Sequence, residues 1–202
     1  ANILESPAAF DGTVNPVEKV PDWVHWKGDN HSTLYSEIAS NMLIDLPHYD
    51  LKALQTPEEN LKWGNPADDE VRNAKLTYSV VYLGNYELDY QEKAGSHLAV
   101  DIRMPKGTPV NSIANGEVVK VSLTEDGFGH HVVIEHPNVP DPGNPSGKTT
   151  LFSAYNHMSD VIVKEGDIVK KGQMIGKSGE TGTATTPHLH FQIDKASAPW
   201  HP

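Results

Sequence analysis

The chain carries two short segments whose histidines and carboxylate are spaced to suit a zinc site: His97-Leu98-Ala99-Val100-Asp101 and His188-Leu189-His190. A catalytic zinc takes three protein ligands from nitrogen and oxygen donors and keeps one position open for water, whereas a structural zinc closes four positions, usually with cysteine. The chain has no cysteine. We therefore expect an open site of histidine and carboxylate ligands that carries out metal-assisted hydrolysis. Either pattern alone can arise by chance among eleven histidines, so the rest of the chain must decide.

The second segment has the residue pattern of a β-strand. Side chains alternate along a strand, so His188 and His190 share one face, with Cα atoms about 7 Å apart, and Leu189 lies on the other. Both histidines can then line one cleft. Either both bind the metal, or one binds it while the other transfers protons. The alternative is a pair of solvated histidines on an exposed strand face.

The first segment needs a bend to serve one metal ion. Val100 and Ile102 favour a strand, and four residues of a straight strand span about 13 Å, which is too far for His97 and Asp101 to share an ion. The small Ala99 permits a bend between them.

The remaining histidines have weaker signals. His157 lies at the end of a predicted strand in Tyr155-Asn156-His157-Met158-Ser159, and a lone histidine there is more often a hydrogen-bonded polar residue than a catalyst. His130, His131 and His136 flank another predicted strand. We expect these three to be structural or surface residues, with His136 buried and hydrogen-bonded.

After about residue 90 the sequence is typical of an all-β unit, with short β-branched runs separated by glycine, proline or asparagine. Two phrases, which begin at Lys106 and Lys164, look like the turn-strand units of the biotinyl/lipoyl type of β-sandwich. No Met-Lys-Met attachment site accompanies them, so a carrier domain is not expected. The proline-rich stretch 137–148 is expected to be a surface loop. The predicted strands are 110–114, 116–123, 131–136, 149–155, 168–169, 174–177 and 188–193.

Residues 1–90 are expected to form a partly helical accessory region. Apolar residues at helical spacing predict an amphipathic helix over 32–46, which Pro47 ends. Thr56-Pro57 and Asn65-Pro66 are typical starts of two further short helices, and 76–83 has the composition of a strand.

The net charge of −11 is concentrated in the first part of the chain: residues 1–90 hold 15 acidic and 6 basic residues. Neither part offers the concentrated basic surface that nucleic acid binding needs, which argues against a nucleic acid partner. No apolar run approaches the ~20 residues of a transmembrane helix, and the N-terminus lacks a signal-peptide pattern. The oligomeric state stays open.

From about Ser96 to Asp194 the chain resembles the LytM/lysostaphin-type zinc metallopeptidases, the M23 family. Its motifs are HxxxD, a Tyr-x-His-hydrophobic-Ser phrase and a terminal HxH, and all occur here in order. The resemblance implies that Zn²⁺ is bound by His97, Asp101 and His190, while His157 and His188 flank the metal-bound water. One of the latter two would take the proton from that water, and the other would stabilise the oxyanion or protonate the leaving amine; the sequence does not say which.

The same resemblance implies a zinc metalloendopeptidase that hydrolyses peptide cross-links or bridges of bacterial peptidoglycan, in the periplasm or outside the cell. The expected architecture is a mainly β, antiparallel sandwich over 91–202, with an α-containing N-terminal extension over 1–90. Ala99, Thr186 and Gln192 depart from the commoner glycine, glycine and glutamate of the family.

Two other functions fit the same motifs. One is a non-catalytic module that binds or regulates at the cell wall, and the other is a zinc peptidase of the same fold that acts on a non-wall peptide. The N-terminal region has three possible roles: to pack against the β unit, to dock a partner, or to inhibit by laying a side chain such as Asn30 or His31 on the zinc.

Overall fold

The computed structural model describes residues 6–49, 77–80, 82, 97–198 and 202. Within these ranges the regular structure consists of strands and two short 3₁₀ turns. The elements in chain order are β1 (Lys19–Pro21), η1 (Tyr35–Glu37), η2 (Ser40–Met42), β2 (Leu43–Asp45), β3 (Tyr78–Val80), β4 (Val100–Arg103), β5 (Pro109–Asn111), β6 (Gly116–Leu123), β7 (His130–Asp141), β8 (Asn144–Val161), β9 (Ile168–Val169), β10 (Met174–Ser178) and β11 (His188–Lys195).

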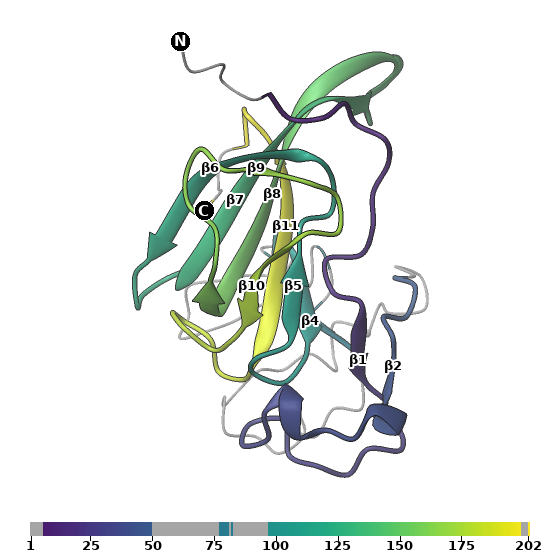
Figure 1. Cartoon of the computed structure of the whole chain (residues 1–202), viewed down its shortest axis with the longest axis vertical. Helices are drawn as coiled ribbons and strands as arrows, with labels where there is room; N and C mark the ends of the chain where they lie inside the picture. Colours follow the sequence, from purple (N-terminus) through teal and green to yellow (C-terminus); the bar gives the residue numbers. More distant parts are fainter. Residues whose placement is uncertain (1–5, 50–76, 81, 83–96, 199–201) are drawn as a thin grey trace.

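The larger sheet is antiparallel and has the order β3-β4-β11-β8-β7-β6-β9, with β10 joining it by pairing with β8 and β5 joining it by pairing with β10 (Figure 1). The long strand β8 organises this sheet. Residues 151–156 of β8 pair with β11, whereas its far end, from Met158 to Val161, pairs with β10. The mainly β, antiparallel fold that the sequence predicts is thus observed, and each of the seven predicted strands between residues 110 and 193 overlaps an observed one.

The prediction of a loop over 137–148 is wrong. Strands β7 and β8 continue through this stretch as a hairpin, in which Val139 pairs with Thr149 and Asp141 pairs with Asn144. The register shifts between His136 and Val139 and again after Pro140, and such irregularities let a strand accommodate prolines that have no N–H to donate. Figure 1 shows this hairpin as the green loop that extends beyond the neighbouring strands.

The helix predicted over 32–46 is also wrong. This segment forms the turns η1 and η2 and then strand β2, which pairs with β1 so that Ile44 lies opposite Val20. Serine and asparagine in the middle of the segment are weak helix formers, and the strand pairing, together with burial of Ile38 and Leu46, outweighs the helical spacing. The short helices predicted after Thr56 and Asn65 lie outside the described residues.

One hydrophobic core joins the N-terminal segment to the sheet. Val17 and Val20 are fully buried in the same cluster as Ile102, Val110 and Tyr155. The segment is also tied by its backbone, because Val14 N donates to Ile113 O and Asn111 N donates to Pro16 O. No helix among the described residues is long and apolar enough to cross a membrane.

Candidate metal centre

The first two residues of the centre face each other across neighbouring strands. Strand β11 pairs with β4 so that His190 lies opposite Asp101, and His190 Nδ1 is 3.1 Å from Asp101 Oδ1. The chain bends at Ala99, just before β4, and this bend brings His97 Nε2 to 3.1 Å from the same oxygen. The structure therefore brings His97, Asp101 and His190 together, by the bend that the sequence predicted.

The donor set of these three residues fits a divalent metal. One ligand atom from each residue lies within 4.8 Å of the other two, and His97 and Asp101 are almost completely buried. Burial by itself raises the pKa of Asp101, but the positive charge of His97 and then of His188, with hydrogen bonds from His190 and His97, holds that pKa well below its ordinary value. An ionised carboxylate beside two imidazoles is the nitrogen and oxygen set that an open zinc site uses.

His157 reaches the same place from β8 through a bulge. Its φ is +62°, a left-handed value that is uncommon outside glycine, although histidine adopts it more often than most other residues. This residue separates the part of β8 that pairs with β11 from the part that pairs with β10, and bulges commonly re-aim a side chain. The ring centroid of His157 is 4.8 Å from that of His188 and 5.7 Å from that of His190.

The two histidines outside the ligand set are held in the same tautomer. His157 Nδ1 is 2.8 Å from Thr181 O, and His188 Nδ1 is 2.6 Å from Thr186 O. A carbonyl oxygen only accepts, so each Nδ1 carries the proton, and the tautomer is assigned from this geometry. A ring that is protonated at Nδ1 alone presents Nε2 as a proton acceptor. Nε2 of His188 lies 3.7 Å from Asp101 Oδ2.

Burial keeps His157 neutral. It lowers the pKa of His157 to about 3, and the positive charge that His188 and His190 carry when protonated acts in the same direction, while Asp101 opposes it. The ring is therefore unprotonated near neutral pH, so its Nε2 carries a lone pair.

The sequence analysis did not identify a series of hydrogen bonds that runs from His190 through Gln192 to Asp194. His190 Nε2 is 3.3 Å from Gln192 Oε1, and Gln192 Nε2 donates to both carboxylate oxygens of Asp194, at 2.9 and 3.0 Å. Gln192 can therefore accept from Nε2–H, which leaves the Nδ1 lone pair directed at the cluster. The alternation of polar residues at 188, 190, 192 and 194 on one strand face was the signal that could have revealed this series.

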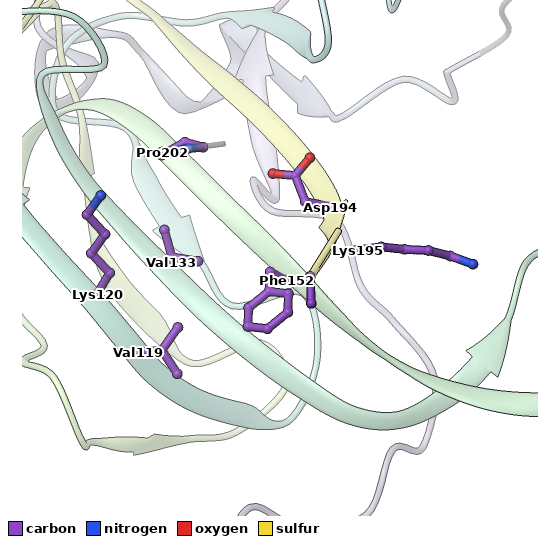
Figure 2. A pocket seen from close by; sticks show the side chains of 8 residues that line it. Val119, Lys120, Val133, Phe152, Asp194, Lys195 and Pro202 are labelled. Carbon is purple, nitrogen blue, oxygen red and sulfur yellow. The ribbon is translucent and has the colours of Figure 1, made fainter. Parts of the chain in front are cut away.

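A pocket of about 300 Å³ lies next to Asp194, the last residue of this hydrogen-bonded series. Its lining includes Asp194, Val133 and Phe152 but none of the five predicted site residues (Figure 2). Figure 2 shows Asp194 and Lys195 projecting to opposite sides of β11, and Lys195 Nζ donates to Asp141 Oδ1 at 3.0 Å.

His130, His131 and His136 have the structural or surface positions that the sequence predicted. His136 is buried and its Nδ1 donates to Asn115 O at 2.9 Å, while its Nε2 is 2.7 Å from Ser153 Oγ. His130 pairs with the exposed Glu125. His131 is buried beside Phe128, whose ring centroid also lies 5.7 Å from that of His190. Phe128 is thus an aromatic neighbour of the site that sequence reasoning did not single out.

Comparison with known proteins places these motifs in one family. The model of peptidase family M23 matches residues 95–202, which is more than half of the chain. The chain is 37% identical to glycyl-glycine endopeptidase ALE-1 of Staphylococcus capitis over 59% of the chain and 32% of that protein. It is also 37% identical to lysostaphin of Staphylococcus simulans over 60% of the chain and 24% of that protein.

A relative from Vibrio cholerae shows the same level of similarity. The peptidoglycan DD-endopeptidase ShyA of Vibrio cholerae is 37% identical over 50% of the chain and 21% of that protein. The chain thus spans at most about a third of the length of these three relatives. Because the family model covers more than half of the chain and includes all five residues that the fold gathers here, the chain belongs to peptidase family M23.

Proposed function

We propose that this chain is a zinc-dependent endopeptidase that hydrolyses peptide cross-links or bridges of bacterial peptidoglycan. The observation that carries the proposal is that a His97-Asp101-His190 donor set lies beside two histidines, His157 of β8 and His188 of β11, whose Nδ1 atoms are each held by a backbone carbonyl. The peptidoglycan and glycyl-glycine substrates in the names of its relatives support the substrate class.

In this proposal His97, Asp101 and His190 hold Zn²⁺. Zinc bound there would polarise the scissile carbonyl and lower the pKa of water toward neutrality. The register between β4 and β11 fixes two of the ligands on rigid strands, so the donor geometry does not depend on loop closure.

His157 and His188 would transfer protons between the attacking water and the leaving amine. Each presents an Nε2 acceptor because its Nδ1–H is held by a carbonyl. One ring would take the proton from the attacking water, and the other would stabilise the oxyanion or protonate the leaving amine. Among the described residues no glutamate lies in the cluster, which supports histidine rather than carboxylate as the base.

The proposal extends to organisation and location. We infer that residues 91–202 form the peptidase domain and 1–90 an accessory region, and that the strands close as a sandwich of the biotinyl/lipoyl type. The division of β8 between β11 and β10 supports such a closure. The substrate places the action in the periplasm or outside the cell.

The proposal is tested by digesting purified peptidoglycan and identifying new amino termini by mass spectrometry. We expect new amino termini with the zinc-loaded protein, none after chelation, and recovery when zinc is restored. Binding to peptidoglycan without any new amino terminus would instead support a non-catalytic module. Cleavage of synthetic peptides but not of peptidoglycan would support a non-wall substrate.

A further inference from the structure

We propose that Asn30, which lies outside the family match, is a positioning residue for His188 because it holds the carbonyl of the preceding residue, Pro187. The inference rests on the proposed function, in which His188 accepts or donates a proton during hydrolysis. It gives the N-terminal segment a supporting role in catalysis.

The contact is buried and spans the chain. Asn30 is only 3% exposed, and its Nδ2 donates to Pro187 O at 3.1 Å, 157 residues away in the sequence. Proline has no N–H, so this carbonyl is the main-chain group through which Pro187 can be hydrogen-bonded. The peptide unit that the bond fixes leads directly into His188.

The loop that contains Pro187 orients both histidines outside the ligand set. It runs from Gly179, after β10, to Pro187, before β11. Thr181 O accepts from His157 Nδ1, and Thr186 O accepts from His188 Nδ1. The conformation of this loop therefore decides which nitrogen each ring presents to the site.

The first half of the loop is held by the sheet. Thr181 Oγ1 donates to Met158 O at 2.8 Å and accepts from His130 N at 2.9 Å. Thr183 N also donates to Gly127 O. These contacts hold Thr181 O in place for His157.

The second half is held from the N-terminal segment. Another side-chain contact from this segment reaches the start of the loop, where His31 Nδ1 lies 3.2 Å from Glu180 Oε1; this pair is partly exposed, and such pairs contribute little. The sheet contact from His188 N to Gly179 O is long, at 3.3 Å. The backbone of His188 also pairs with Arg103 of β4. Loss of the buried Asn30 bond should therefore move Thr186 and Pro187 first and, through Thr186 O, the ring of His188.

The expected consequence is specific to turnover. The ligands Asp101 and His190 are placed by strand register and His97 by the bend at Ala99, so zinc binding should not depend on Asn30. A proton-transfer group that is displaced by a fraction of an ångström lowers the rate, and loss of a supporting hydrogen bond typically costs about 10-fold or more in activity.

The test is Asn30→Leu in the full chain. Leucine has nearly the same shape but cannot donate to Pro187 O. It also removes the Asn30 Oδ1 atom, which is buried without a hydrogen-bond partner, and this offsets part of the stability lost when Pro187 O is left without its donor. We expect kcat to fall about 10-fold, while KM and zinc affinity stay at the wild-type values.

Asn115→Leu is the matched control. Asn115 is another buried asparagine that ties the N-terminal segment to the sheet, by donating to Ala9 O at 2.9 Å. It contacts none of the five site residues in the described structure. This variant should lose stability and keep its kcat.

A second measurement does not depend on activity. In zinc-loaded protein labelled with ¹⁵N, the His188 Nδ1–H proton should exchange with water about 10-fold faster in Asn30→Leu than in wild type.

Unchanged kcat and unchanged exchange would overturn the proposal, as would a fall in kcat explained by lost zinc. A rise in kcat would also overturn it, because Asn30 would then be inhibitory. If the wild type cleaves no peptidoglycan, the proposed function fails, and the exchange measurement still decides the role of Asn30.

Discussion

His190 and Asp101 lie opposite each other on β11 and β4, with His190 Nδ1 3.1 Å from Asp101 Oδ1. Two ligands of the proposed zinc site are therefore set by strand register. A shift of β11 by one residue would turn His190 to the other face of the sheet, away from Asp101. The site is consequently part of the folded sheet itself, and we expect it to be present before zinc binds.

His157→Asn should separate zinc binding from hydrolysis. Asparagine tolerates the left-handed backbone at this position but cannot act as a base. We expect zinc affinity to stay unchanged and kcat to fall by about 10²–10⁴-fold, measured by release of amino groups from peptidoglycan. His130→Asn is the control, since His130 pairs with exposed Glu125 and should keep full activity. A fully active His157→Asn protein would contradict the assigned role.

Gln192→Met should weaken zinc binding. It keeps the length of the side chain but removes the acceptor for His190 Nε2–H and the donor to Asp194. Loss of such a supporting partner typically costs about 10–100-fold in metal affinity, which competition with a chelator would measure. Gln173→Met is the control, because Gln173 accepts from Lys170 N on an exposed turn. Equal zinc affinity in both variants would show that Gln192 does not support His190.

The stability of the metal-free protein should fall as the pH drops from 7 to 5. Burial lowers the pKa of His136, although its hydrogen bond to Asn115 O opposes the shift. The unfolded chain, with a histidine pKa of about 6.5, then takes up the proton first. The stabilisation is complete above that pH and is lost below it, with a slope of up to about 1.4 kcal/mol per pH unit for each such group.

His136→Gln tests this origin. The variant should be less stable at pH 7, because the buried hydrogen bonds to Asn115 and Ser153 are disturbed. Its loss of stability between pH 7 and pH 5, from urea unfolding, should be shallower than that of the wild type. An identical slope would show that His136 does not contribute.

The sequence predicted five site residues that the structure brings together, because short motifs and their resemblance to the M23 family single these residues out. Strand alternation placed His188 and His190 on one face, and the distance argument required the bend at Ala99 that the structure shows. The mainly β fold was also predictable, because turn residues separate its β-branched runs. The metal-binding and catalytic roles of the five residues stay predictions.

The sequence was not sufficient where contacts between residues far apart in the chain determine the local structure. Helical spacing over 32–46 was overridden by pairing of β2 with β1, which local propensity cannot foresee. Prolines over 137–148 suggested a loop, yet the register shifts of the β7–β8 hairpin accommodate them. The bond from Asn30 to Pro187 joins residues 157 positions apart, and no motif marks either partner.

The most direct test of the central claim is to measure bound zinc and amino-group release from purified peptidoglycan on the same preparation, for wild type and for His190→Ala. We predict one zinc per wild-type chain with hydrolysis, and loss of both in the variant. Hydrolysis that persists in a zinc-free His190→Ala protein would contradict the assignment of His97, Asp101 and His190 as the metal site of a zinc endopeptidase.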